Sequence, residues 1–204
     1  MHHARRRLWL LSAALFALAV GFHLSAAIYL HRDSTLHDLE EDETEYYTWA
    51  GKLLAGDGEF NTRRPIVHVG IVAALRKLTG DDLFAIRLGL LTIFSTTAPL
   101  TFALVARFVG SVRAAFLAGL GVAVWPLFVR FSGTLYSETT ATPLFLLFLL
   151  ILPTGRDPAS PGRWLASGLV LGLATLSRAM YMLYLPFLAI ALVVEGGLNR
   201  RTVF

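Results

Sequence analysis

Long apolar runs constrain this chain more than any other feature. The first covers residues 8–30 and follows three consecutive arginines, Arg5 to Arg7. A helix needs about 20 apolar residues to cross a bilayer, whereas the apolar core of a signal peptide has roughly 7–15. Arginine favours the cytoplasmic side of a membrane. We therefore expect an uncleaved membrane helix whose N-terminus lies in the cytoplasm.

Four or five further crossings are expected after this first helix. Residues 83–106, 114–131 and 139–152 each form an apolar run, and two shorter runs, 165–177 and 180–194, flank Arg178. The two short runs form either one bent helix or a hairpin. The hairpin is favoured because it leaves Arg200 and Arg201 in the cytoplasm.

The fold class predicted is an all-α, polytopic integral membrane protein. It has about six transmembrane helices in a single domain, residues 1–204, and a cell-membrane location. A chain that is 55% hydrophobic and only 16% charged agrees with this class. Because there is no cysteine, disulfides and thiolate metal sites are excluded. The net charge of +4 comes from basic residues that flank apolar runs. These residues act as topology signals, so we expect the bilayer as a partner and no nucleic acid.

The acidic residues are concentrated in one segment. Residues 31–64 hold nine of the fourteen Asp and Glu residues, and we expect residues 31–82 to form an external loop. The nine are Asp33, Asp38, Glu40, Glu41, Asp42, Glu43, Glu45, Asp57 and Glu59.

Two short interfacial helices are expected inside this loop. Asp42, Tyr46 and Trp49 recur at helical spacing, and Gly56 ends the first helix. Asp42 is expected as its N-cap, with Glu45 as capping-box partner. The second helix is expected to begin at Pro65 and to end at Gly80.

This topology places several charged side chains near the outer surface. Asp42 and Glu43 lie in the loop, Glu138 follows an outer turn, and Arg178 lies between the two short runs. Charged residues beside membrane segments are expensive and indicate function. Each also has a structural explanation: a cap for Asp42, a turn end for Glu138, and an arginine that snorkels to lipid headgroups for Arg178. Tyr46 and Trp49 also suit an interfacial aromatic belt.

Several motifs, taken in their order along the chain, resemble those of a known protein family. The pattern Asp42-Glu43-x-x-Tyr46-x-x-x-Ala50 follows the first membrane helix, and Arg64-Pro65 and a helix ending in LTG come next. FAIRLGLLTIFSTTAPLTFALVARFVG, AAFLAGLGVAVWPLFVRFSGTLYSE and LASGLVLGLATLSRAMYMLYLP follow in that order. From residue 8 to about residue 192 the chain resembles the N-terminal membrane module of the polyprenyl-phosphate-sugar-dependent glycosyltransferases with the GT-C fold. That group includes the dolichyl-phosphate-mannose-protein mannosyltransferases, the aminoarabinose transferase of lipid A and the lipopolysaccharide-core transferases.

The resemblance implies roles for individual residues. An acidic residue of the first external loop is the general base in that family, which carries over to Asp42, with Glu43 beside it. The acceptor hydroxyl then attacks the anomeric carbon of the lipid-phosphate sugar with inversion. Arg178 carries over as the arginine that pairs with the lipid phosphate. The implied substrate-binding residues are Tyr46, Trp49, Arg64, His68, Glu138 and Arg178.

The implied partners are a polyprenyl-phosphate sugar and an acceptor glycan, lipid or protein. The implied enzyme is a hexosyl- or pentosyltransferase on the extracytoplasmic face. It needs no metal and no cofactor besides the lipid-linked donor. Arg64-Pro65 and His68 depart from the Pro-Pro or Tyr-Pro pair that members often carry. Members also usually have more membrane helices, so the chain is expected to be a fragment, a truncated reading frame or half of a split enzyme that lacks its C-terminal half.

Two other function classes fit the apolar composition. A transporter subunit would use Glu138 and Arg178 to line a solute path, but inverted repeats are not found in the sequence. A non-catalytic membrane assembly or lipid-binding protein is the second class, and a truncated chain is the best argument for it.

Overall fold

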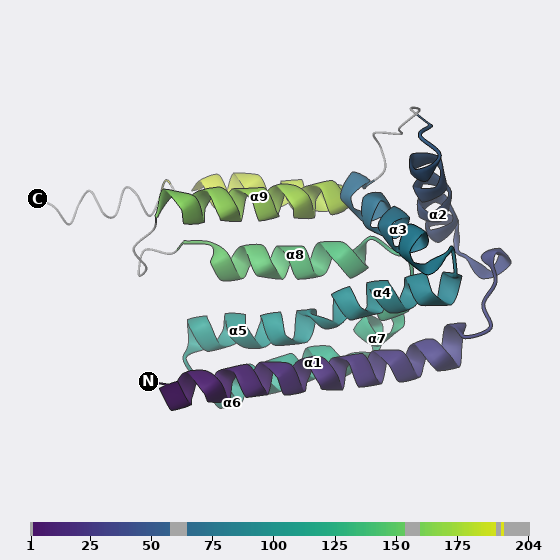
Figure 1. The fold of residues 1–204 in the computed structure, drawn as a ribbon. Helices are drawn as coiled ribbons and strands as arrows, with labels where there is room; N and C mark the ends of the chain where they lie inside the picture. The colour runs from purple at the N-terminus through teal and green to yellow at the C-terminus, as the bar shows by residue number, and fades with distance from the viewer. Residues whose placement is uncertain (1, 58–64, 154–159, 191–192, 194–204) are drawn as a thin grey trace, which may run out of the picture.

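The computed structural model describes residues 2–57, 65–153, 160–190 and 193, and these residues form a bundle of helices. Figure 1 shows α1, α4, α5, α6, α8 and α9 with their axes roughly aligned, while α2 and α3 gather at one end and lie across the bundle. The helices are α1 His2–His31, α2 Glu41–Leu54, α3 Ile66–Thr79, α4 Leu83–Ser95, α5 Thr97–Val109, α6 Val112–Val124, α7 Pro126–Ser132, α8 Glu138–Ile151 and α9 Pro161–Ser177, with short 3₁₀ turns η1 Leu36–Asp38 and η2 Ala179–Leu183.

The expected all-α class is confirmed for the described residues, whereas the predicted count of about six transmembrane helices is not. Within the described residues, two helical segments are long and apolar enough to span a membrane, Arg6–His31 and Leu83–Val109. The pair α6 and α7 makes a third span if its 55° bend is counted as one broken helix. Glu138–Ile151 and Ala179–Ile190 are apolar but shorter. The predicted count of six is therefore not confirmed.

Both breaks in the spanning segments have a local cause. Between α4 and α5, the Thr96 hydroxyl donates to the Ile93 carbonyl at 2.7 Å, and the backbone takes a tighter turn there. Between α6 and α7, Trp125 is extended, with φ −62° and ψ 123°, and Pro126 begins the next helix. An extended residue before proline is expected, because the proline ring disfavours the α conformation of its predecessor.

The chain reverses direction at Arg178, which agrees with the predicted hairpin. Arg178 is extended, with φ −160°, and ends α9. Tyr181 and Tyr184 then lie with their ring centroids 4.5 and 4.6 Å from that of Phe145, about two turns into α8. Since Glu138 begins α8 beside Arg178, the residues after Arg178 must run back along that helix. Figure 1 shows this returning segment beside α9.

The predicted N-cap of α2 is wrong. Glu40 caps the helix, and Glu43 is its capping-box partner: the Glu43 carboxylate accepts the Glu40 N–H at 3.2 Å. Asp42 lies in the first turn instead. Its charge suits that place, since the helix N-terminus carries partial positive charge.

The buried stripe of α2 also differs from the predicted face. Glu43, Tyr46 and Ala50 are buried, while Asp42 is exposed. Seven residues make two helical turns, so Glu43 and Ala50 lie on one line with Tyr46 between them. This stripe packs on Val69, Val72 and Ala73 of α3 and on Ile86 and Leu90 of α4.

An ion pair and several hydrogen bonds connect α2 to α3 and to the residues that follow α3. Arg76 Nε and Nη2 donate to the two carboxylate oxygens of Asp81 at 2.6 and 2.8 Å, and Arg76 Nη1 donates to the Tyr47 carbonyl at 2.6 Å. The Tyr47 hydroxyl donates to Asp81 at 2.8 Å. A Cβ on Gly51 would lie 2.8 Å from Arg76 Nη1, so glycine leaves room for the guanidinium at this place.

Candidate functional site

Polar side chains converge where α2, the start of α8 and the end of α9 meet. Arg178 Nη1 lies 2.5 Å from Glu138 Oε1, and the two side chains are 33% and 25% exposed. The same Nη1 lies 3.4 Å from Ser137 Oγ. The hairpin at Arg178 and the turn before Glu138 thus bring together two residues that are 40 positions apart.

Tyr46 connects this ion pair to α2. Its ring is 7% exposed, and its hydroxyl hydrogen-bonds the Ser137 side chain. Burial raises the Tyr46 pKa, and the charges of Asp42, Glu138 and Arg178 act on it. Asp42, Tyr46, Glu138 and Arg178 therefore lie in one region of the structure.

Asp42 is the exposed carboxylate of this neighbourhood. It lies in the first turn of α2, four residues before Tyr46, so the two side chains emerge on the same side of the helix. The charge of Asp42 also acts on Tyr136 in the turn before α8. An exposed carboxylate can take a proton, and an arginine of the same region can hold an anion.

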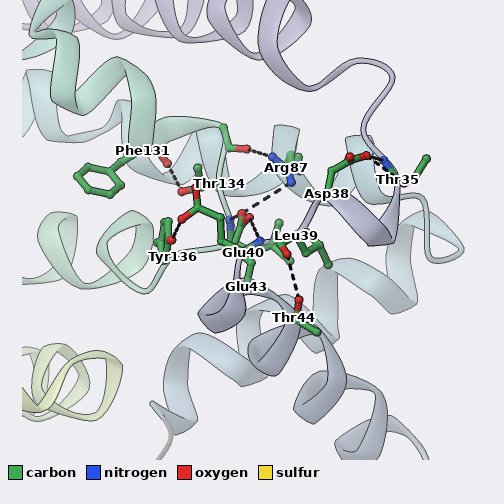
Figure 2. Close-up of polar contacts among 12 residues, drawn as sticks. Thr35, Asp38, Leu39, Glu40, Glu43, Thr44, Arg87, Phe131, Thr134 and Tyr136 are labelled. Carbon is green, nitrogen blue, oxygen red and sulfur yellow. Dashed lines mark hydrogen bonds and ion pairs between the residues drawn. The ribbon is translucent and has the colours of Figure 1, made fainter.

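Glu43 has a different environment from its neighbour. It is 3% exposed, and its Oε1 accepts the Leu135 N–H at 2.7 Å. Arg87 Nη2 lies 3.7 Å from the same oxygen. Figure 2 shows these contacts from α2 to α4 and to the turn before α8. Buried charges are tolerated when they are paired and hydrogen-bonded, as both are here.

The turn of residues 133–137 is held from two sides. Arg87 Nη1 donates to the Gly133 carbonyl at 2.8 Å, and the Tyr136 hydroxyl donates to Glu40. Figure 2 shows the Tyr136 contact with Glu40 at the start of α2. Because Ser137 and Glu138 follow this turn directly, these bonds fix the backbone position from which the Glu138 side chain extends.

His68 lies inside the protein rather than on the exposed side of the site. It is fully buried; Nε2 lies 2.6 Å from the Leu135 carbonyl and Nδ1 lies 3.1 Å from Thr140 Oγ1. Burial lowers the His68 pKa to about 4, so the ring is neutral at pH 7 and donates from Nε2. Its ring packs edge-on against Tyr46, with centroids 5.0 Å apart. His68 therefore packs against Tyr46 on the buried side of its ring.

Of the two remaining predicted residues, only Trp49 lies within the described part of the chain. Trp49 is half-buried against the α2–α3 core, and Lys52 Nζ lies 4.5 Å from its ring centroid. Arg64 lies outside the described residues. Among the residues that the structure describes, no group of three or more His, Asp or Glu side chains could hold a metal ion.

Two residues of this region were missed by the sequence reasoning. Arg87 is a single charge inside the apolar run 83–106, and that isolation was a usable signal, since charges in such runs seldom lack a role. Ser137 had no comparable signal. Only the folded turn brings its hydroxyl to Tyr46 and Arg178.

Comparison with protein families gives one result. A family model described as dolichyl-phosphate-mannose-protein mannosyltransferase matches residues 63–203, more than half of the chain. No curated protein and no solved structure matches the sequence.

Proposed function

The chain belongs to the dolichyl-phosphate-mannose-protein mannosyltransferase family, a family of membrane glycosyltransferases of the GT-C type, and we propose that it transfers a sugar from a polyprenyl-phosphate donor to a hydroxyl acceptor. The reaction takes place at the end of the bundle where α2 and α3 lie. The observation that carries this proposal is the shared location of Asp42, Tyr46, Glu138 and Arg178 at that end.

Asp42 is the general base of the proposed reaction. It takes the proton of the acceptor hydroxyl while the acceptor oxygen bonds to the anomeric carbon of the sugar. The bond from that carbon to the phosphate oxygen breaks, and the lipid phosphate leaves with the electron pair. Attack from the face opposite the leaving group inverts the anomeric configuration. A positioned base contributes roughly 10²–10⁴-fold to such a step.

Asp42 is a better candidate for this role than Glu43. A base must reach the proton it removes, and the Asp42 side chain is exposed. Glu43 is buried, and its oxygens accept two backbone N–H groups and pair with Arg87. We therefore assign Glu43 to positioning of the turn before Glu138.

Arg178 holds the donor phosphate in this proposal. Guanidinium groups bind phosphate oxygens through two parallel N–H bonds, and the phosphate gains charge as the sugar leaves. Arg178 is one-third exposed, so part of its guanidinium can be reached by a ligand. Ser137 connects Arg178 to Tyr46 of α2, since its side chain hydrogen-bonds both.

The proposed location is the cell membrane, with the N-terminus in the cytoplasm and the acidic loop outside. This orientation puts Asp42 on the extracytoplasmic side, where lipid-linked sugars are donors rather than nucleotide sugars. The sugar is a hexose or a pentose, and the acceptor is a glycan, lipid or protein.

The direct test is donor turnover. Membranes that contain the chain, together with any further membrane subunit it requires, are supplied with radiolabelled dolichyl-phosphate-mannose and a pool of acceptors. The proposal expects label transfer to acceptor, release of dolichyl phosphate, and inversion at the anomeric carbon. Retention of configuration would contradict a single displacement assisted by Asp42.

A further inference from the structure

Glu138 neutralises the arginine that is proposed to hold the donor phosphate. Its Oε1 lies 2.5 Å from Arg178 Nη1, so the charges of these two side chains offset each other before a ligand enters. Both side chains are partly exposed, and Ser137 Oγ lies 3.4 Å from the same nitrogen. An arginine whose task is to attract an anion would bind it more tightly without this carboxylate.

The charge of the phosphate changes during the proposed reaction. The donor is a phosphodiester with one negative charge, whereas the leaving lipid phosphate is a monoester with about −1.5 to −2 charges at pH 7. Interaction energy with a fixed charge scales with the charge of the ligand. Arg178 alone would therefore bind the product more tightly than the donor and slow its release.

We propose that Glu138 is a specificity-determining residue that selects the singly charged donor phosphodiester over the doubly charged product. This proposal rests on the proposed function, since it takes Arg178 as the phosphate-binding residue. The Glu138 carboxylate repels every phosphate that approaches Arg178, and it repels the monoester about twice as strongly. The donor enters at a modest loss of affinity, and the product leaves faster.

The variant that isolates the charge is Glu138→Gln. Glutamine keeps the side-chain length and an oxygen that accepts from Arg178, so the geometry of the pair is retained. We expect the affinity for dolichyl-phosphate-mannose to rise roughly threefold and that for dolichyl phosphate to rise roughly tenfold, because the two gains scale with ligand charge. Both dissociation constants are measured on the same protein preparation. Their ratio is then independent of the fraction that is folded.

Two controls accompany this measurement. Glu138→Asp keeps the charge and should leave the ratio of the two affinities near that of the unaltered protein. Glu41→Gln removes an exposed carboxylate from the first turn of α2 and should also leave the ratio unchanged. Equal gains for donor and product in Glu138→Gln, no gain, or weaker binding of both would each overturn the inference.

Arg178→Gln separates this inference from the proposed function. Loss of affinity for both lipids in this variant supports the phosphate site, whatever Glu138→Gln does. If Arg178→Gln binds dolichyl phosphate and dolichyl-phosphate-mannose as tightly as the unaltered protein, the phosphate site itself is wrong. If Arg178→Gln loses affinity but Glu138→Gln leaves the ratio unchanged, only the role of Glu138 is wrong.

Discussion

Glu43 Oε1 lies 3.7 Å from Arg87 Nη2, and the two side chains are only 4% and 1% exposed. This pair joins α2 to α4. Glu43 also accepts the Leu135 N–H, and Arg87 also donates to the Gly133 carbonyl. One carboxylate and one guanidinium thus connect α2, α4 and the turn that leads to Glu138.

Removal of one partner of this pair should be costly. Arg87→Met leaves Glu43 charged and buried, and we expect unfolding free energy to fall by about 3–5 kcal/mol. Denaturant unfolding in detergent micelles measures this change. The double variant Glu43→Gln/Arg87→Met should recover much of the loss, because no unpaired charge is left behind. A double variant that loses the sum of the two single losses would show that the residues do not act as a pair.

His68 should make stability depend on pH. Its pKa is lowered from 6.5 to about 4 in the folded protein, so the unfolded chain binds the proton first as the pH falls. Stability is therefore lost between pH 6.5 and 4, by about 3 kcal/mol in total, and little more is lost through this group below that range. Thermal unfolding of the protein and of His68→Gln is compared at pH 7 and pH 5. If both lose equal stability on acidification, His68 is not the group responsible.

The proposed orientation can be tested with reporter fusions. A reporter that is active only outside the cytoplasm, inserted among residues 58–64, should be active, and the same reporter among residues 154–159 should be silent. The matched insertion after residue 2 should also be silent. Cytoplasmic placement of the 58–64 reporter would contradict the location proposed for Asp42.

The shape of the Arg178 side chain should matter for donor binding. Lysine keeps the positive charge but lacks the planar fork that binds two phosphate oxygens. Arg178→Lys should therefore weaken dolichyl-phosphate-mannose binding, by roughly tenfold for one lost charged hydrogen bond. Arg130→Lys, an exposed arginine paired with Glu40, is the matched control. Equal affinity in Arg178→Lys and the unaltered protein would mean that the Arg178 guanidinium does not bind the phosphate through two hydrogen bonds.

The sequence predicted the helical class because that class follows from local patterns. Apolar runs locate α1 and the span Leu83–Val109, and the Arg178 hairpin follows from arginine distribution. The N-cap of α2 was missed because Glu40, Glu41 and Asp42 are consecutive acids, and only backbone geometry decides which one precedes the helix. The partners of Glu43 could not be predicted, since Arg87 and Leu135 reach it through tertiary packing.

The hydrogen-bond partners of His68 could not be predicted from the sequence either. Its spacing from Pro65 placed it on the second short helix, but the groups that satisfy its nitrogens come from the turn before α8 and from α8 itself, about 70 residues later. A sequence pattern describes one helix face. It does not state which distant element covers that face.

The role of Asp42 is tested most directly by sugar transfer in Asp42→Asn. Glu40 rather than Asp42 caps α2, so the cap is retained in this variant, and the lost interaction with the helix N-terminus costs about 0.3–1 kcal/mol. Asparagine cannot accept the acceptor proton. We predict a loss of roughly 10²–10⁴-fold in the transfer rate from radiolabelled dolichyl-phosphate-mannose with donor affinity retained, while the neighbouring Glu41→Gln stays near the unaltered rate. Transfer by Asp42→Asn at the rate of the Glu41→Gln control would contradict the assignment of Asp42 as the general base.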